Sequence, residues 1–164
     1  MMLRRLAAAL AAAWLFSSAD GLRAEPLTPM SSEGLADELA LSEGKVVLIN
    51  LWATWCSPCL KEIPDLLALE QELSSDDFRL LAISMDDIYS EGWVNEFKAK
   101  HFPDLVSFIN AEMDMDTLVS ALDPAWNETL PTSYILNREG EVVHKIQGKK
   151  PIDYFRSQVI AAGL

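Results

Sequence analysis

KVVLINLWATWCSPCLKEIP, residues 45–64, is the stretch that decides the fold. It opens with an apolar run rich in β-branched residues, Val46–Trp52, which predicts a buried strand. A turn through Ala53 and Thr54 follows, and a helix is expected to begin at or just after Cys56. The chain's two cysteines, Cys56 and Cys59, therefore stand where a buried strand meets a helix. At this spacing the two sulfurs can form a disulfide or separate as thiols, so the pattern predicts a redox-active pair.

The helix start gives the two cysteines different predicted roles. Unpaired N–H groups and the helix dipole stabilise a thiolate at Cys56, so this thiol should ionise more readily than a free one. Cys59 lies one turn further in and is predicted to be the better buried, resolving thiol. Ser57 and Pro58 suit the first helical turn, where the missing N–H of proline costs nothing. The alternative is a structural disulfide, but one that closes so small a loop would add little stability.

The motif Trp55-Cys56-Ser57-Pro58-Cys59 resembles that of the thioredoxin-like proteins of the TlpA/ResA/CcmG type. The flanking residues Asn50–Thr54 and Lys61–Pro64 extend the resemblance, which covers residues 27–164. These relatives are bacterial thiol-disulfide oxidoreductases that work outside the cytoplasm. The resemblance implies an α/β thioredoxin fold, with a mixed central sheet flanked by helices and a central helix–strand insertion near 91–122. It implies no cofactor beyond the redox-active disulfide Cys56–Cys59.

The first 24 residues have the pattern of a secretory signal peptide. Arg4 and Arg5 precede an uncharged, alanine-rich run, and small residues offer cleavage points after Ala19 or Ala24. An uncleaved membrane anchor is the alternative, although the apolar run is short for a bilayer span. The sequence thus predicts a periplasmic domain over 25–164.

The chain is acidic, with a formal net charge of −12. Removal of the arginine-containing leader would make the remaining domain more acidic still. An acidic domain without basic clusters argues against partners such as nucleic acid or anionic membrane surfaces.

Strands and helices are predicted to alternate along the rest of the chain. An extended lead-in, 27–30, precedes a helix that starts after Ser31 or Ser32 and ends near Gly44. Leu41, Trp93 and Ile160 are among the side chains expected to face the core. The other expected strands are 78–85, 105–109 and an antiparallel pair, 132–136 and 141–146; the other expected helices are 57–74, 90–100, 113–122 and 151–162.

Pro131 is predicted to form the second part of the site. Thioredoxin-like proteins carry a cis proline facing the two cysteines, and the resemblance implies that this proline also keeps metal ions from the thiols. A cis bond here would expose the backbone of Leu130, next to Thr132, for pairing with an extended client segment. The alternative is an ordinary trans proline before a strand.

Glu62 is the candidate proton-transfer group. It lies three residues after Cys59 on the same helical face, and ResA-like proteins have a glutamate at the matching position that assists proton movement. A buried carboxylate could take the proton from Cys59, whereas the alternative is a surface charge beside Lys61. Thioredoxin carries a buried aspartate where this chain has Asn50, which cannot exchange protons.

Three tryptophans surround these residues in the sequence. Trp55 is predicted to lie on the rim of the client-binding surface, and Trp52 in the core. Trp126 either contacts the client or packs against the domain.

The favoured function is reduction of client disulfides, and the resemblance implies apocytochrome c or copper-site cysteines as the clients. The Ser-Pro dipeptide lacks the histidine found between the cysteines of strong oxidants, which favours a reducing couple. The resemblance implies a membrane thiol transporter as electron donor, and a monomer is expected. The alternatives are a disulfide oxidant or isomerase, a copper chaperone that binds Cu(I) through the two cysteines, and a thiol peroxidase. No metal site is assigned to His101, His144, Met113 or Met115.

Overall fold

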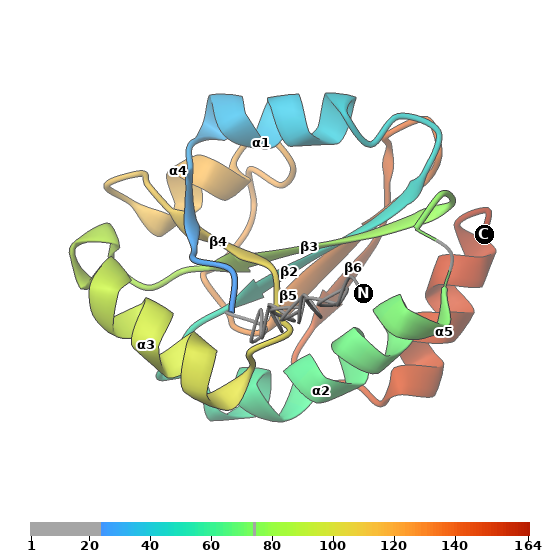
Figure 1. Ribbon diagram of the computed structural model, residues 1–164. Helices are drawn as coiled ribbons and strands as arrows, with labels where there is room; N and C mark the ends of the chain where they lie inside the picture. Colours follow the sequence, from blue (N-terminus) through green and yellow to red (C-terminus); the bar gives the residue numbers. More distant parts are fainter. Residues whose placement is uncertain (1–23, 74) are drawn as a thin grey trace, which may run out of the picture.

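The computed structural model describes residues 24–73 and 75–164 (Figure 1). Apart from Ala24, the predicted signal peptide lies outside these residues. Within the described ranges, no helix is both long enough and apolar enough to cross a bilayer.

The core of the molecule is a six-stranded mixed sheet with strand order β1-β4-β3-β2-β5-β6. The first four strands in this order are parallel, and β5 and β6 run antiparallel to their neighbours. The central strand β2 pairs with β3 on one side and β5 on the other. The strands are β1 Thr28–Met30, β2 Val46–Trp52, β3 Phe78–Ser84, β4 Ser107–Asn110, β5 Thr132–Leu136 and β6 Val142–Gln147.

Helices cover both faces of the sheet (Figure 1). The face under α1 and α4 buries Val47, Ile49 and Leu51 of β2, whereas the face under α2 and α5 buries Val46 and Leu48. All seven residues of β2 are buried, which explains why the strand is apolar at every position except Asn50. The helices are α1 Ser32–Ala40, α2 Ser57–Glu72, α3 Glu91–His101, α4 Met115–Val119 and α5 Ile152–Ala161, with a 3₁₀ turn, η1, at Ile88–Ser90.

A third cluster joins the carboxyl end of β2 to the start of α2. It contains Trp52, Cys56, Cys59 and Ile63, and Val94 of α3 packs into it. The two cysteines are thus part of the packed interior at this end of the sheet.

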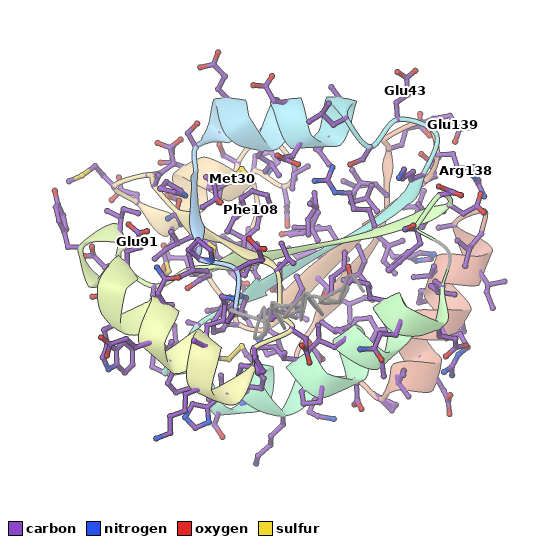
Figure 2. All side chains as sticks on the ribbon, in the orientation of Figure 1. Met30, Glu43, Glu91, Phe108, Arg138 and Glu139 are labelled. Carbon is purple, nitrogen blue, oxygen red and sulfur yellow. A yellow bond between two sulfur atoms is a disulfide. The ribbon has the colours of Figure 1, made fainter. Side chains whose placement is uncertain are left out.

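The predicted thioredoxin-like α/β arrangement is confirmed, but some details differ. The lead-in before α1 forms β1, which pairs with β4, and Met30 packs in one cluster with Phe108 at this edge (Figure 2). The strand predicted at 105–109 is β4, at 107–110, and the helix predicted at 113–122 is shortened to α4.

Three side chains that were expected to face the core are exposed. Leu41 follows the last residue of α1 as its C-cap, and Ile160 lies off the stripe formed by Phe155 and Val159. On α3 the inner positions belong to Val94 and Lys98, one turn apart, which turns Trp93 outward. Lys98 is fully buried and donates to the carbonyl of Leu105 at 2.8 Å.

Candidate active site

Cys56 and Cys59 form a disulfide at the amino terminus of α2, with their Cα atoms 5.3 Å apart. Cys56 is the N-cap of the helix, and its sulfur accepts the backbone N–H of Cys59 at 3.3 Å. Ser57 and Pro58 occupy the first helical turn, as predicted. An N–H directed at the Cys56 sulfur favours negative charge on that sulfur, which is what a nucleophilic thiolate requires.

Both cysteines are buried, so access to them is restricted. Cys56 keeps 5 % of its surface exposed and Cys59 only 1 %. Any group that reacts with the pair would therefore first meet Cys56, the outer of the two sulfurs. This is the order of burial that the sequence predicts for an attacking and a resolving thiol.

The turn before Cys56 is fixed by Asp86, a residue that sequence reasoning missed. Its carboxylate accepts the backbone N–H of Thr54 at 2.9 Å, the hydroxyl of Thr54 at 2.6 Å and the hydroxyl of Ser84 at 2.7 Å. Asp86 is buried and lies just beyond the end of β3, beside the end of β2. The sequence did hold a signal for this role, a carboxylate directly after a buried strand. Neighbouring parallel strands end at the same edge of a sheet, so this carboxylate could be expected near the end of β2.

Glu62 is buried, with 1 % of its surface exposed, so the surface-charge alternative is wrong. Its Oε1 accepts the backbone N–H of Lys150 at 2.9 Å, and its Oε2 accepts the side-chain amide of Asn50 at 3.3 Å. Burial raises the pKa of the Glu62 carboxyl to about 7, although these two hydrogen bonds and the charge of Lys149 act in the opposite direction. Such a group can gain or lose a proton near neutral pH.

The segment 130–132 lies beside the end of β2. The Leu130–Pro131 peptide bond is cis, as predicted, and the Pro131 carbonyl accepts the N–H of Gly148 at 2.9 Å. Thr132 pairs with Leu51 of β2, and Leu130 packs against the cluster that contains both cysteines. The fold thus brings together the predicted client-binding residues and the disulfide, which are more than 70 residues apart in the sequence.

The tryptophans occupy three different environments. Trp55 is 63 % exposed beside Cys56, in keeping with a place on the rim, whereas Trp52 is fully buried. Trp126 is also buried and donates from Nε1 to the hydroxyl of Thr132 at 3.2 Å, so it packs against the domain. Among the described residues, no group of three or more His, Cys, Asp and Glu side chains is arranged to hold a metal ion.

Comparison with known proteins agrees with this arrangement. A family model described as the AhpC/TSA family matches residues 31–145. The thiol-disulfide oxidoreductase ResA of Bacillus thuringiensis (strain Al Hakam) is 32 % identical over 120 residues, which is 72 % of this chain and 64 % of ResA. The ResA of Bacillus subtilis (strain 168) is 29 % identical over 132 residues, 80 % of this chain and 69 % of that protein. The chain thus spans just under two thirds of the first relative's length.

A solved structure shares the fold. The thiol:disulfide interchange protein, a thioredoxin family protein from Chlorobium tepidum TLS, superposes with a TM-score of 0.62 at 24 % identity. The match covers 75 % of this chain and 83 % of that one. With this thioredoxin fold and a family match over most of its length, the chain belongs to the AhpC/TSA family.

Proposed function

We propose that this protein is a thiol-disulfide oxidoreductase that reduces disulfides of client proteins outside the cytoplasm. The observation that carries the proposal is the Cys56–Cys59 pair at the start of α2, one helical turn from the buried carboxylate of Glu62. The similarity to proteins named thiol-disulfide oxidoreductase ResA supports the same activity.

The first step is attack on the client. In the reduced protein, the Cys56 thiolate attacks one sulfur of a client disulfide. A new bond forms between Cys56 and that sulfur, the client disulfide breaks, and the second client sulfur leaves as a thiolate. The N–H of Cys59 and the helix start stabilise the attacking charge.

The second step releases the client. Glu62, as the carboxylate, takes the proton from the Cys59 thiol, and the Cys59 sulfur attacks Cys56. The Cys56–Cys59 disulfide forms while the mixed disulfide breaks, and the client sulfur leaves with its electron pair. The client has then gained two electrons, and the couple is the only redox group that the reaction uses. A dithiol donor must reduce the couple again, and a membrane thiol transporter has the required chemistry.

The residues between the cysteines support the direction of electron flow. Ser57 and Pro58 supply no positive charge to the Cys56 thiolate, in contrast to a histidine at this place. Weaker thiolate stabilisation favours the disulfide form and makes the dithiol a stronger reductant. We therefore assign the protein to reduction, with cysteines of apocytochrome c or of copper sites as the client class and a monomer as the working unit.

An extracytoplasmic location rests on the sequence of residues 1–24, which has the features of an export signal, cleaved or retained as an anchor. Protein disulfides are abundant in such compartments, so a reductase would find clients there. In this proposal the periplasmic client docks between Trp55 and the segment Leu130–Thr132, with its sulfur over Cys56.

A trapping experiment tests the activity. The Cys59→Ser variant should accumulate a mixed disulfide between Cys56 and a disulfide-containing protein such as insulin, because the resolving thiol is missing. Cys56→Ser is the matched control and should trap nothing, because Cys59 is the more buried of the two sulfurs. Equal trapping by both variants, or reduction of insulin by neither the wild-type dithiol nor its variants, would contradict the proposal.

A further inference from the structure

A pocket of about 290 Å³ opens beside Trp55, on the opposite side of the disulfide from Pro131. Its walls come from the segment after β3 and from the segment between β4 and α4. The apolar part of the lining consists of Trp55, Met85, Ile88, Tyr89, Met113 and Met115. Because Trp55 is the residue directly before Cys56, the pocket adjoins the turn that leads into the attacking residue.

Several of these apolar side chains face solvent. Trp55 is 63 % exposed, Tyr89 86 % and Met113 87 %. A large apolar group rarely stays exposed in clusters on a soluble protein unless another molecule covers it. Methionine adapts its shape to different partners, which suits a surface that must accept more than one client sequence.

The pocket also carries negative charge. Asp87 and Glu112 are in its lining, and no Lys, Arg or His is among the described residues that form it. The Glu112 carboxylate accepts the N–H and hydroxyl of Ser32, which lowers its pKa and keeps it ionised. The exposed Asp87 carboxylate accepts the N–H of Tyr89 with one oxygen, at 2.8 Å. The third carboxylate, Asp86, is buried and is engaged by Thr54 and Ser84. A cation entering the pocket would meet two carboxylates and the aromatic side chains of Trp55 and Tyr89, and aromatic rings can attract cations as well.

Strand order sets the distance from the pocket to the disulfide. β2, which leads to Cys56, is the middle one of three neighbouring strands. On one side of it lies β5, which follows Pro131, and on the other side lies β3, which leads to the pocket. Neighbouring strands are about 4.8 Å apart, and an extended chain advances about 3.3 Å per residue. A client segment that lies over Leu130 and Cys56 therefore reaches the pocket within about two or three residues of its reactive cysteine.

We propose that this pocket binds an arginine or lysine side chain of the client, two or three residues from the cysteine that Cys56 attacks. The aliphatic stem of the basic side chain packs on the methionines and aromatic rings, while its charged end meets Asp87 and Glu112. This inference rests on the proposed function and names the client chemistry that the site selects.

The test compares peptides that differ in one property. Each peptide has one cysteine, held in a mixed disulfide with 2-mercaptoethanol. The residues three positions before and three positions after this cysteine are both arginine in the first peptide, both citrulline, the neutral isostere of arginine, in the second, and both glutamate in the third. The reduced wild-type protein should reduce the arginine peptide about fivefold faster than the citrulline peptide at low ionic strength, and the glutamate peptide more slowly than both. The difference should shrink in about 1 M salt, where the Debye length is about 3 Å.

The second part of the test removes the negative charges of the pocket by mutation. The double variant Asp87→Asn and Glu112→Gln keeps both side-chain carbonyl acceptors and should lose the preference for arginine. The matched control is the double variant Glu43→Gln and Glu139→Gln, which also removes two exposed carboxylates. Both lie at the opposite end of the molecule from Glu91, the residue that follows η1 and so marks the pocket side (Figure 2). This control should keep the preference.

The outcomes separate the two proposals. Equal rates for the arginine and citrulline peptides, or a preference that survives in the pocket variant, would overturn the pocket assignment and leave the reductase activity standing. Failure of the wild-type protein to reduce any of the three peptides would instead overturn the proposed function, and with it this inference.

Discussion

The side-chain amide of Asn50 donates to Oε2 of Glu62 at 3.3 Å, so a neutral donor, and not a second acid, faces the buried carboxylate that follows Cys59 by one helical turn. The same amide nitrogen donates to the hydroxyl of Ser133 at 3.0 Å, which fixes its orientation. Asn50 therefore stabilises the ionised form of Glu62 without competing for the proton. Glu62 is the titrating group of this pair.

Replacement of Glu62 by Gln should slow the release of client by on the order of 100-fold at pH 8, because Cys59 then lacks its base. The wild-type rate should rise with pH through an inflection near pH 7, the pKa to which burial raises Glu62, and the Glu62→Gln variant should lack this inflection. Single-turnover reduction of a peptide disulfide between pH 5 and 9 measures both effects. Glu70→Gln is the control, since Glu70 is a half-buried glutamate of the same helix but lies two turns further along. A Glu62→Gln variant with the wild-type profile would remove Glu62 from the mechanism.

Asn50→Asp should move that inflection upward by at least about one pH unit, because a second negative charge would then face Glu62. The control is Ser133→Ala, which removes the other partner of the Asn50 amide but leaves the Glu62 contact intact. Its inflection should stay near that of the wild type. A downward shift in the Asn50→Asp variant would contradict the assignment of the titration to Glu62.

Glu62 should also make the oxidised protein less stable at higher pH. Its folded-state pKa of about 7 is above its ordinary value of 4.5, so the folded protein binds more protons than the unfolded chain between these values. The free energy of unfolding must then fall as pH rises through this window, by up to about 3 kcal/mol from this one group. Urea unfolding of wild type and Glu62→Gln from pH 4 to 8 should give curves that separate steadily over that range. Parallel curves would show that Glu62 titrates normally.

Much of the fold follows from the sequence because it depends on local patterns. The apolar run of β2 predicts both ends of that strand, and the proline after Cys56 places the start of α2 at or just after that cysteine, where the helix begins at Ser57. By contrast, the burial of Lys98 and the exposure of Trp93 depend on which face of α3 packs against the rest of the domain. Helical periodicity in the sequence predicted that Trp93 lies on the buried face.

The site was only partly predictable for a similar reason. The cysteine pair and Pro131 are marked by their motifs, but the environment of Glu62 depends on Lys150, 88 residues later in the chain. Asp86 likewise gains its role only when β3 pairs with β2 and brings it to Thr54. Contacts between residues so far apart leave no periodic signal in one sequence.

Asp86→Ala should destabilise the protein by about 2–4 kcal/mol, because it leaves the N–H and hydroxyl of Thr54 and the hydroxyl of Ser84 without their buried acceptor. The neighbouring Asp87→Ala removes only an exposed cap of η1 and should cost about 1 kcal/mol or less. Urea unfolding of the two oxidised variants gives the comparison. Equal losses would mean that the Asp86 network does not hold the turn before Cys56.

The reduction potential of the Cys56–Cys59 couple tests the assignment to reduction most directly. The oxidised protein is equilibrated in dithiothreitol buffers of graded ratio, free thiols are alkylated, and the oxidised fraction is read from the mass shift. The absence of a charged residue between the cysteines predicts a value near that of thioredoxin, about −270 mV. A value near that of DsbA, about −120 mV, would contradict it and make the protein an oxidant of its clients.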